Sequence, residues 1–300
     1  MNLSTKRLQD GRTLILDGGM GQELAARGLE TGDGLWSARA LLDDPEAVVA
    51  VHRDFINAGA DVITANSYAA TRRRLDSADI EDGFNRCNRA AGTLARRAAD
   101  EAGRQVLVAG SLPPIHGSYR PDRVRPLAEI EPLYREQAAI LAEYADLFIC
   151  ETMSTAGEAL AAARGAAASG LPVWVSWTVA DDGSGRLRSG ETVREAIEAL
   201  DGIEVEAVLL NCSMPESVAA AMPALAQHTG RPFGAYANGF SAIGAGFDVA
   251  DGANVPDRRE ELTPERYAEH VRRWRDAGAS IIGGCCEVGP AHIAELRKII

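Results

Sequence analysis

Residues 45–66, PEAVVAVHRDFINAGADVITAN, contain one complete structural repeat of the chain. Proline is favoured at the first position of a helix, so Pro45 predicts that a helix begins there. Gly59 predicts where that helix stops, because glycine readily adopts the left-handed conformation at a helix end. The run that follows, 61–66, is short and apolar in its centre, as in a strand buried on both faces. The segment therefore predicts a helix over 45–58 that leads directly into a strand.

The same alternation extends through the whole chain. Short apolar runs typical of buried strands occupy 13–17, 61–66, 106–111, 147–152, 172–179, 207–213, 233–238 and 280–286. Helical patterns occupy 45–58, 78–101, 126–143, 155–169, 191–200, 215–227, 263–276 and 290–299. Eight strands with intervening helices favour an α/β fold with one domain over 1–300, a single (β/α)8 TIM barrel, over a doubly wound open sheet.

Two long loops, 112–125 and 239–262, follow predicted strands and are rich in glycine, proline and charge. Loops after the strands of a TIM barrel gather at its C-terminal face, where such barrels keep their active sites. Polar residues also stand where the predicted strands end: Asp17, Asn66, Ser67, Tyr68, Ser111, Glu151, Thr152, Asn211, Cys212, Asn238, Cys285 and Cys286. We therefore expect an active site at the C-terminal face of the strands.

Composition restricts the partners. The 300 residues are 46% hydrophobic and 25% charged, with a formal net charge of −12. Such an acidic balance disfavours a nucleic-acid backbone or an anionic membrane as partner. No apolar run approaches the roughly 20 residues of a membrane span, and residues 1–7 lack the apolar stretch of a secretory signal. We expect a cytoplasmic protein with small-molecule substrates and no nucleic-acid or membrane partner, and a homo-oligomer remains open.

The chain has five cysteines, an odd number for a disulfide framework. Cys87 in a helical pattern and Cys150 inside a strand run are interpreted as small buried hydrophobic residues. Cys212, Cys285 and Cys286 instead lie at the ends of predicted strands six and eight, which are near neighbours across the mouth of a barrel. In a reducing compartment, clustered thiols are more often metal ligands or nucleophiles than disulfides.

Zinc is the metal that this set of thiols predicts. Soft sulfur ligands favour it over magnesium, calcium or manganese, and catalytic zinc commonly has three protein ligands and one open position. An iron–sulfur cluster would normally need a fourth cysteine. The glycines of 283–284 let the backbone bend so that both thiols of the Cys285-Cys286 pair face one ion. Three unconnected buried thiols, or a strained disulfide within the pair, are the alternatives.

A thiolate-rich zinc site holds a substrate thiol in its ionised form, so the predicted reaction is attack of that sulfur on an electrophilic carbon. Asp17 and Glu151, at the ends of strands one and four, suit a substrate ammonium group. Gly18, Gly19 and Met20 form a glycine-rich turn before a helix, and its backbone N–H groups suit a carboxylate. Together these features predict a pocket for an amino acid that carries a thiol.

Seven motifs resemble those of the homocysteine S-methyltransferase family, and the resemblance covers nearly the whole chain. The motifs are Leu16-Asp17-Gly18-Gly19-Met20, Leu35-Trp36-Ser37, Ile63-Thr64-Ala65-Asn66-Ser67-Tyr68, Glu151-Thr152, Asn211-Cys212, Tyr236-Ala237-Asn238 and Gly283-Gly284-Cys285-Cys286. The resemblance implies a TIM barrel whose zinc is held by Cys212, Cys285 and Cys286.

The resemblance also assigns the homocysteine-binding residues. It implies that Asp17 and Glu151 bind the amino group of homocysteine, and that the amides around Gly18, Gly19 and Met20 bind its carboxylate.

Three further residues match family positions near the reacting groups. Asn238 matches a residue that can occupy zinc until the substrate thiol displaces it. Trp36 and Tyr68 match aromatic positions near the methyl donor, where a sulfonium or quaternary ammonium would be attracted to ring faces. Each of these two aromatic residues could instead pack in the core.

The donor is predicted by smaller features. Met153 follows Glu151-Thr152 where a betaine-using enzyme would carry an aromatic residue, while Trp36 and Tyr68 lie in segments like those of the S-methylmethionine type. We expect zinc-dependent methyl transfer from S-methylmethionine to homocysteine, forming methionine. The alternatives are a methylated corrinoid partner protein, another onium donor such as betaine or dimethylsulfoniopropionate, and a non-enzymatic zinc-storage barrel.

Overall fold

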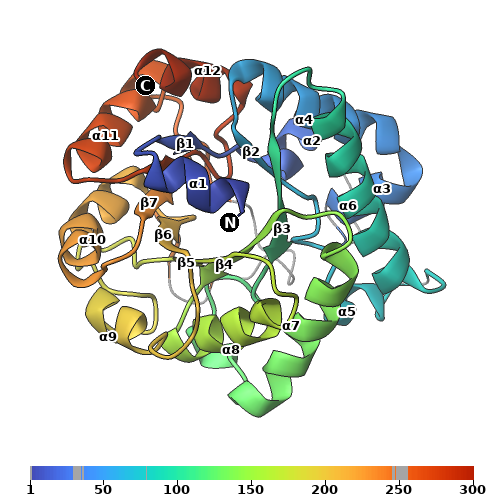
Figure 1. Ribbon diagram of the computed structural model, residues 1–300, viewed down its shortest axis with the longest axis horizontal. Coiled ribbons are helices and arrows are strands. Elements are labelled where there is room, and N and C mark those ends of the chain that lie inside the picture. Colours follow the sequence, from blue (N-terminus) through green and yellow to red (C-terminus); the bar gives the residue numbers. More distant parts are fainter. Residues whose placement is uncertain (1, 30–34, 36, 79, 245–246, 248–255) are drawn as a thin grey trace.

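Eight parallel strands form one sheet in the order β1-β8-β7-β6-β5-β4-β3-β2. The computed structural model describes residues 2–29, 35, 37–78, 80–244, 247 and 256–300. The strands are β1 (Leu14–Ile15), β2 (Val62–Thr64), β3 (Leu107–Leu112), β4 (Leu147–Met153), β5 (Val173–Trp177), β6 (Ala207–Asn211), β7 (Phe233–Tyr236) and β8 (Ile281–Ile282). Helices surround this ring of strands on its outside (Figure 1).

The sheet closes on itself at β1. On one side, Leu14 pairs with Ile281 of β8. On the other, Leu16 forms a parallel bridge to Val62 of β2, and the Asp17 amide donates to the Val62 carbonyl oxygen at 3.1 Å. The (β/α)8 TIM barrel is therefore confirmed, and the doubly wound open sheet is excluded.

The helices that cover the barrel include all eight that the sequence predicts. They are α1 (Leu3–Gln9), α2 (Met20–Ala26), α3 (Ser37–Asp43), α4 (Pro45–Ala58), α5 (Arg72–Leu75), α6 (Gly83–Asp100), α7 (Leu127–Leu141), α8 (Ala156–Ala167), α9 (Val193–Glu198), α10 (Pro215–His228), α11 (Pro264–Asp276) and α12 (Pro290–Lys298), with a short 3-10 helix at Pro121–Arg123. Helix α4 has the predicted bounds, and Gly59 ends it in the left-handed conformation at φ 111°.

Three details differ from the prediction. The helix expected over 78–101 begins only at Gly83, because Asp82 has a left-handed backbone (φ 50°) that interrupts helical geometry. The strand expected over 280–286 ends at Ile282, although the amides of Gly283 and Cys285 still donate to the carbonyl oxygens of Ala235 (3.2 Å) and Ala237 (2.9 Å). Helices α1, α3 and α5 are not predicted, because segments of seven residues or fewer are too short to reveal a helical period, and α2 is predicted only as the helix after the glycine-rich turn, without bounds.

Alternate residues of the strands fill two separate hydrophobic layers. The interior of the barrel is packed by one cluster that includes Leu16, Leu107, Ile149, Trp174 and Leu209, all of them buried. Because these side chains fill the inside of the ring, the barrel is a packed core rather than a channel.

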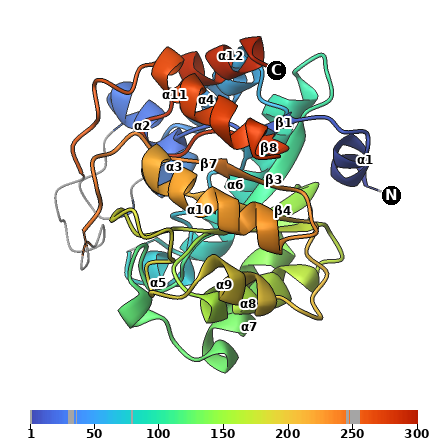
Figure 2. The ribbon, with the colours of Figure 1, turned by 90° about the vertical axis from the view of Figure 1, so that its left-hand side faces the viewer.

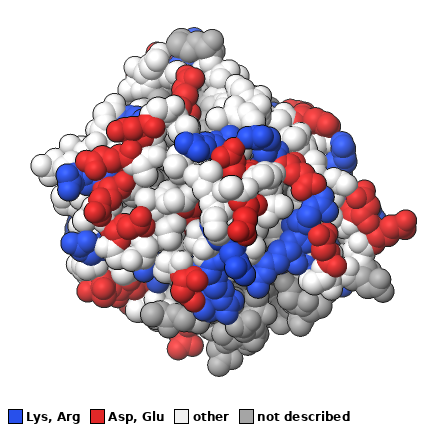
Figure 3. Space-filling view, turned by 90° about the horizontal axis from the view of Figure 1, so that it is seen from below, with Lys and Arg blue, Asp and Glu red and all other residues white. Residues whose placement is uncertain are grey.

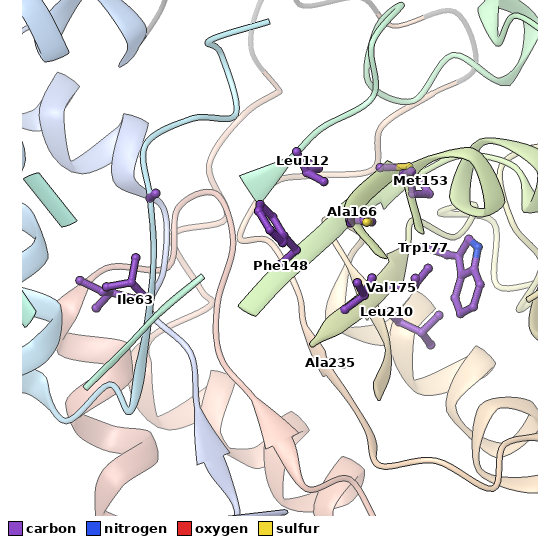
Figure 4. Packing of buried hydrophobic residues seen from close by; sticks show 14 of the residues in the cluster. Ile63, Leu112, Phe148, Met153, Ala166, Val175, Trp177, Leu210 and Ala235 are labelled. Carbon is purple, nitrogen blue, oxygen red and sulfur yellow. The ribbon is translucent and has the colours of Figure 1, made fainter. Parts of the chain in front are cut away.

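The second layer lies between the strands and the helices, and Figure 4 shows part of it, with Phe148, Val175 and Leu210 among the labelled residues. Cys87 and Cys150 both belong to this layer and are completely buried. Their interpretation as small buried hydrophobic residues is confirmed.

Helix α1 covers the end of the barrel opposite α2 (Figure 2). The Glu206 carboxylate anchors this helix, since it accepts hydrogen bonds from the hydroxyls of Ser4 and Thr5. The same carboxylate accepts the indole N–H of Trp174, inside the barrel, at 2.6 Å. One end of the barrel is thus closed by α1, and the ends of the strands that carry the predicted site lie at the other.

Charges of both signs are interspersed over the face shown in Figure 3, so the excess of acidic residues is not gathered into one patch there. Among the residues that the structure describes, Ile300 is the single large hydrophobic residue classed as exposed, at 41%. None of the described helices is both long and apolar enough to cross a membrane.

Candidate metal centre and substrate pocket

Three cysteines from distant parts of the chain lie together at one edge of the barrel. Cys212 directly follows β6, and Cys285 and Cys286 follow the two glycines after β8. Their sulfur atoms all lie within 4.8 Å of one another, and the Sγ atoms of Cys212 and Cys285 are 2.6 Å apart. All are free thiols in the structure. The group could hold a metal ion, because three soft donors converge on one point.

Close packing between the turns after β1 and β8 brings the cysteine pair into place. A Cβ atom on Gly18 would lie 1.9 Å from the carbonyl oxygen of Val288, and one on Gly283 would lie 2.5 Å from the Cβ atom of Leu16. A Cβ on Gly19 would lie 2.9 Å from the carbonyl oxygen of Cys285. No side chain fits at these positions without a shift, so the glycines permit the approach of the two turns.

The third cysteine has an unusual backbone. Cys212 has a φ of 51°, and Thr152, near the end of β4 and two strands away in the sheet, has a φ of 62°. Such left-handed conformations cost non-glycine residues on the order of 1–3 kcal/mol, and they persist only where contacts with the surrounding structure hold them in place. Here Asn211 imposes one of them, because its side-chain oxygen accepts the Thr152 amide at 2.9 Å and its amide nitrogen donates to the Thr152 hydroxyl at 2.9 Å.

The pKa values of the three thiols are shifted in different directions. Hydrogen bonds from Cys285, from Cys286 and from the Tyr119 hydroxyl, whose oxygen is 3.1 Å from Sγ, hold the pKa of Cys212 well below its usual value. The pKa values of Cys285 and Cys286 are correspondingly raised, mainly by their interaction with Cys212. A cation would allow all three thiols to ionise, so the donor set fits a metal ion.

Two buried carboxyl groups lie in the same region. Asp17, 4% exposed, accepts hydrogen bonds from the Thr64 amide at 2.7 Å and the Thr64 hydroxyl at 2.9 Å. Glu151, 7% exposed, accepts the hydroxyls of Ser111 and, at 3.2 Å, of Tyr236. Burial outweighs these hydrogen bonds and raises the pKa of each carboxyl to about 7.

One cavity brings nine of the predicted site residues together. Its empty volume, including open solvent at the mouth, is about 1030 Å³. The predicted residues that line it are Asp17, Gly18, Gly19, Met20, Tyr68, Glu151, Cys212, Cys285 and Cys286. The amide of Gly19 already donates to the Val288 carbonyl oxygen at 3.1 Å, which leaves the neighbouring amides of the turn for a ligand.

Two predicted residues are not part of this lining. Trp36 lies outside the described residues. Asn238 is completely buried just behind the cavity wall, and its Oδ1 accepts the Phe240 amide at 3.3 Å. Its Nδ2 has no hydrogen-bond partner among the residues described.

The sequence prediction missed an aromatic wall that faces the cysteines. Tyr119, Phe240 and Ile243 pack against Cys212, with Phe247 beside them, and the rings of Tyr119 and Phe247 are 6.0 Å apart. These residues come from the two long loops that were expected at the mouth. Their loop position was a signal, but an irregular loop has no period from which the direction of a side chain could be predicted.

A barrel whose three thiols could hold a metal ion beside two buried carboxyls in one cavity has the features of a barrel enzyme, and comparison with known proteins identifies the family. The family model described as homocysteine S-methyltransferase matches residues 14–300. The homocysteine S-methyltransferase of Escherichia coli is 33% identical over 301 residues, which cover 95% of this chain and 94% of that protein. Homocysteine S-methyltransferase 3 of Arabidopsis thaliana is 29% identical and covers 97% of this chain and 90% of its own.

A solved structure agrees. The metallated form of the homocysteine methyltransferase MmuM from Escherichia coli matches with a TM-score of 0.82 and 30% identity, covering 98% of this chain and 99% of that one. The chain belongs to the homocysteine S-methyltransferase family.

The thiol cluster predicts stoichiometric metal binding. Purified protein incubated with Zn²⁺ and dialysed should retain about one ion per chain by elemental analysis, since catalytic zinc needs as few as three protein ligands. Cys285→Ala and Cys286→Ala should retain no stoichiometric metal. Cys87→Ala, which removes a buried thiol outside the cluster, is the matched control and should bind as the wild type does. Equal binding by all three variants would contradict a metal site at this cluster.

The buried carboxyls predict a particular dependence of stability on pH. Because the pKa of Glu151 rises from 4.5 to about 7 on folding, the folded protein holds a proton there that the unfolded chain releases. The free energy of unfolding should therefore fall as the pH rises from about 4.5 to 7. Glu151→Gln should remove the part of this fall that Glu151 contributes and gain up to about 3 kcal/mol over the wild type between pH 4.5 and 8 in urea unfolding, while Asp17 keeps its own part.

Glu269→Gln, which removes a carboxyl at the protein surface, is the control for the loss of one acidic residue. A Glu151→Gln difference that stays constant with pH would show that this carboxyl is ionised throughout.

Proposed function

We propose that the protein transfers a methyl group from S-methylmethionine to homocysteine. The observation that carries the proposal is the single cavity that contains three convergent thiols, two buried carboxyls and an aromatic wall. The relatives in Escherichia coli and Arabidopsis thaliana are named for methyl transfer to homocysteine, which supports this acceptor. We take residues 1–300 to act as one barrel domain in the reducing cytoplasm, where the thiols stay free.

We assign Cys212, Cys285 and Cys286 as ligands of a zinc ion. The metal follows from the donor set, because three sulfur ligands favour zinc over the hard divalent cations. When bound, zinc supplies the positive charge that keeps a substrate thiol ionised at neutral pH. Asn238 is our candidate for a fourth ligand that the substrate displaces. Its complete burial supports this, as does its backbone N–H, which donates at 3.1 Å to the carbonyl oxygen of Ser213, the residue after Cys212.

We assign Asp17 and Glu151 to the ammonium group of homocysteine. A carboxyl that is neutral when buried alone becomes ionised when a cation pairs with it, so the ammonium would restore the charge of both groups. Thr64, Ser111 and Tyr236 already orient the four carboxyl oxygens by hydrogen bonds. The amides of Gly18 and Met20, in the turn that begins α2, would then hold the carboxylate of the amino acid.

We assign the aromatic wall to the methyl donor. The positive charge of a sulfonium is attracted to ring faces, and Tyr68, Tyr119 and Phe240 all line the cavity. Apolar walls also exclude the water that would compete with the reaction.

In the reaction, the homocysteine sulfur forms a bond to the donor methyl carbon while the bond from that carbon to the donor sulfur breaks. The electron pair stays on the donor sulfur, which becomes a neutral thioether, and the thiol proton leaves to solvent. Each turnover would thus give two molecules of methionine, one from the acceptor and one from the donor.

A panel of donors tests the proposal. Zinc-loaded protein with deuterated homocysteine should form deuterated methionine from S-methylmethionine, and unlabelled methionine in equal amount. Betaine, S-adenosylmethionine and dimethylsulfoniopropionate should react about 100-fold more slowly, because betaine and dimethylsulfoniopropionate lack the primary α-ammonium group and S-adenosylmethionine carries a bulky adenosyl group in place of one methyl. Cys87→Ala should be as active as the wild type, and Cys285→Ala inactive. Deuterated methionine that forms only with a methylated corrinoid protein would overturn the assignment of the donor.

A further inference from the structure

A buried ion pair lies behind the aromatic wall. The Arg188 guanidinium and the Asp181 carboxylate are 2.8 Å apart, and their side chains are 6% and 1% exposed. Among the ion pairs described, this is the most deeply buried. Buried ion pairs cost desolvation energy and are weak evidence for stability. We therefore consider which groups this ion pair holds in position rather than how much stability it adds.

The pair joins the loops that follow three neighbouring strands. Asp181, in the loop after β5, accepts the Met214 amide at 2.9 Å and the Ile243 amide at 3.1 Å. Arg188 donates to the Ile243 carbonyl oxygen at 2.8 Å, so both backbone groups of Ile243 are bound to one ion pair. Ile243 itself lines the cavity. The ion pair thus fixes the loop after β7 against the loops after β5 and β6.

Arg188 also reaches a fourth loop, the one after β3. Its guanidinium carbon lies 4.7 Å from the centre of the Tyr119 ring, in a cation–π stack. The hydroxyl of the same tyrosine is the one that donates to the sulfur of Cys212 at 3.1 Å. Tyr119 has a left-handed backbone (φ 64°) and belongs to no strand or helix. Its ring is therefore held by side-chain contacts: the stack with Arg188, the contact with Phe247 and the packing against Phe240 and Ile243.

A hydrogen bond to a thiolate ligand withdraws electron density from the sulfur and so reduces the charge that the sulfur gives to its metal. Its effect depends on the distance and direction of the donor, which here depend on where the ring of Tyr119 lies. A planar guanidinium can stack on that ring and bind Ile243 and Asp181 in its own plane at the same time.

We infer that Arg188 is a positioning residue for the metal centre: by stacking on Tyr119 it keeps the tyrosine hydroxyl on the Cys212 sulfur and so sets the charge that this thiolate donates. The inference rests on the proposed function to the extent that the three cysteines must bind a metal. It goes beyond that function because Arg188 is not among the residues that line the cavity and acts on Cys212 through Tyr119.

The test uses the full-length protein loaded with Co²⁺, whose sulfur-to-metal charge-transfer band reports directly on thiolate ligands. Tyr119→Phe removes the hydrogen bond and should shift this band to longer wavelength, because an undisturbed thiolate gives up an electron more easily. Arg188→Met should shift the band in the same direction and to a similar extent. The double variant should shift it no further than Tyr119→Phe alone, since the two residues act through one hydrogen bond.

Two control variants test whether the effect of Arg188 on the metal centre runs through Tyr119. Arg186→Met removes an arginine of the same loop that donates to the Gly190 carbonyl oxygen at 2.9 Å, and its band should match the wild type. Thr178→Val removes the hydroxyl that accepts from Arg188 at 3.0 Å and donates to the Cys212 carbonyl oxygen at 3.2 Å. Its shift should be smaller than that of Arg188→Met, because this route ends on the backbone rather than on the sulfur.

An unshifted band in Arg188→Met, or a shift that adds to that of Tyr119→Phe, would overturn the inference. If Arg188→Met does not fold, Arg188→Lys takes its place. Lysine keeps the positive charge beside Asp181 but lacks the planar guanidinium that stacks on Tyr119, so the band of Arg188→Lys should also shift. An unshifted band in this variant would likewise overturn the inference. Wild-type protein that gives no sulfur-to-metal band with Co²⁺ would instead refute the proposed metal centre. Failure of the inference about Arg188 can thus be told apart from failure of the proposed function.

Discussion

Closure of the barrel at β1 is the constraint on which the rest of the site depends. The pairing of Leu14 with Ile281 brings together two segments that are far apart in the chain. Beyond the strands, Gly18 and Gly283 then allow the two turns to pack with no room for a side chain. The carboxyl of Asp17 and the thiols of the Cys285-Cys286 pair reach one cavity as a direct result.

The site that this closure creates works against stability. Two carboxyls are buried deeply enough to raise their pKa values to about 7, three thiols crowd around shared charge, and Cys212 has a left-handed backbone. The first two features are unfavourable in the free protein and become favourable when a cation is present: a metal for the thiols, an ammonium for the carboxyls. The two hydrophobic layers of the barrel supply the stability that tolerates this arrangement.

The features that can be predicted from the sequence are those that follow from regular helices and strands. The strand–helix alternation gives all eight strands, and residues at strand ends, such as Cys212 and Glu151, could be assigned to one mouth because parallel strands end together. Tyr119 and Phe240 could not be assigned in this way, since they project from irregular loops whose course depends on tertiary contacts. The left-handed turn at Asp82 was missed for a similar reason, because aspartate at that position carries no signal as clear as glycine.

The central claim is that three cysteines bind a metal and leave one position for the substrate thiol. X-ray absorption at the zinc edge tests this most directly, because it counts sulfur neighbours at about 2.3 Å. Zinc-loaded protein should show three sulfur neighbours and one lighter atom, and addition of homocysteine should replace the lighter atom with a fourth sulfur. A spectrum with three sulfur neighbours both before and after saturation with homocysteine would contradict the account.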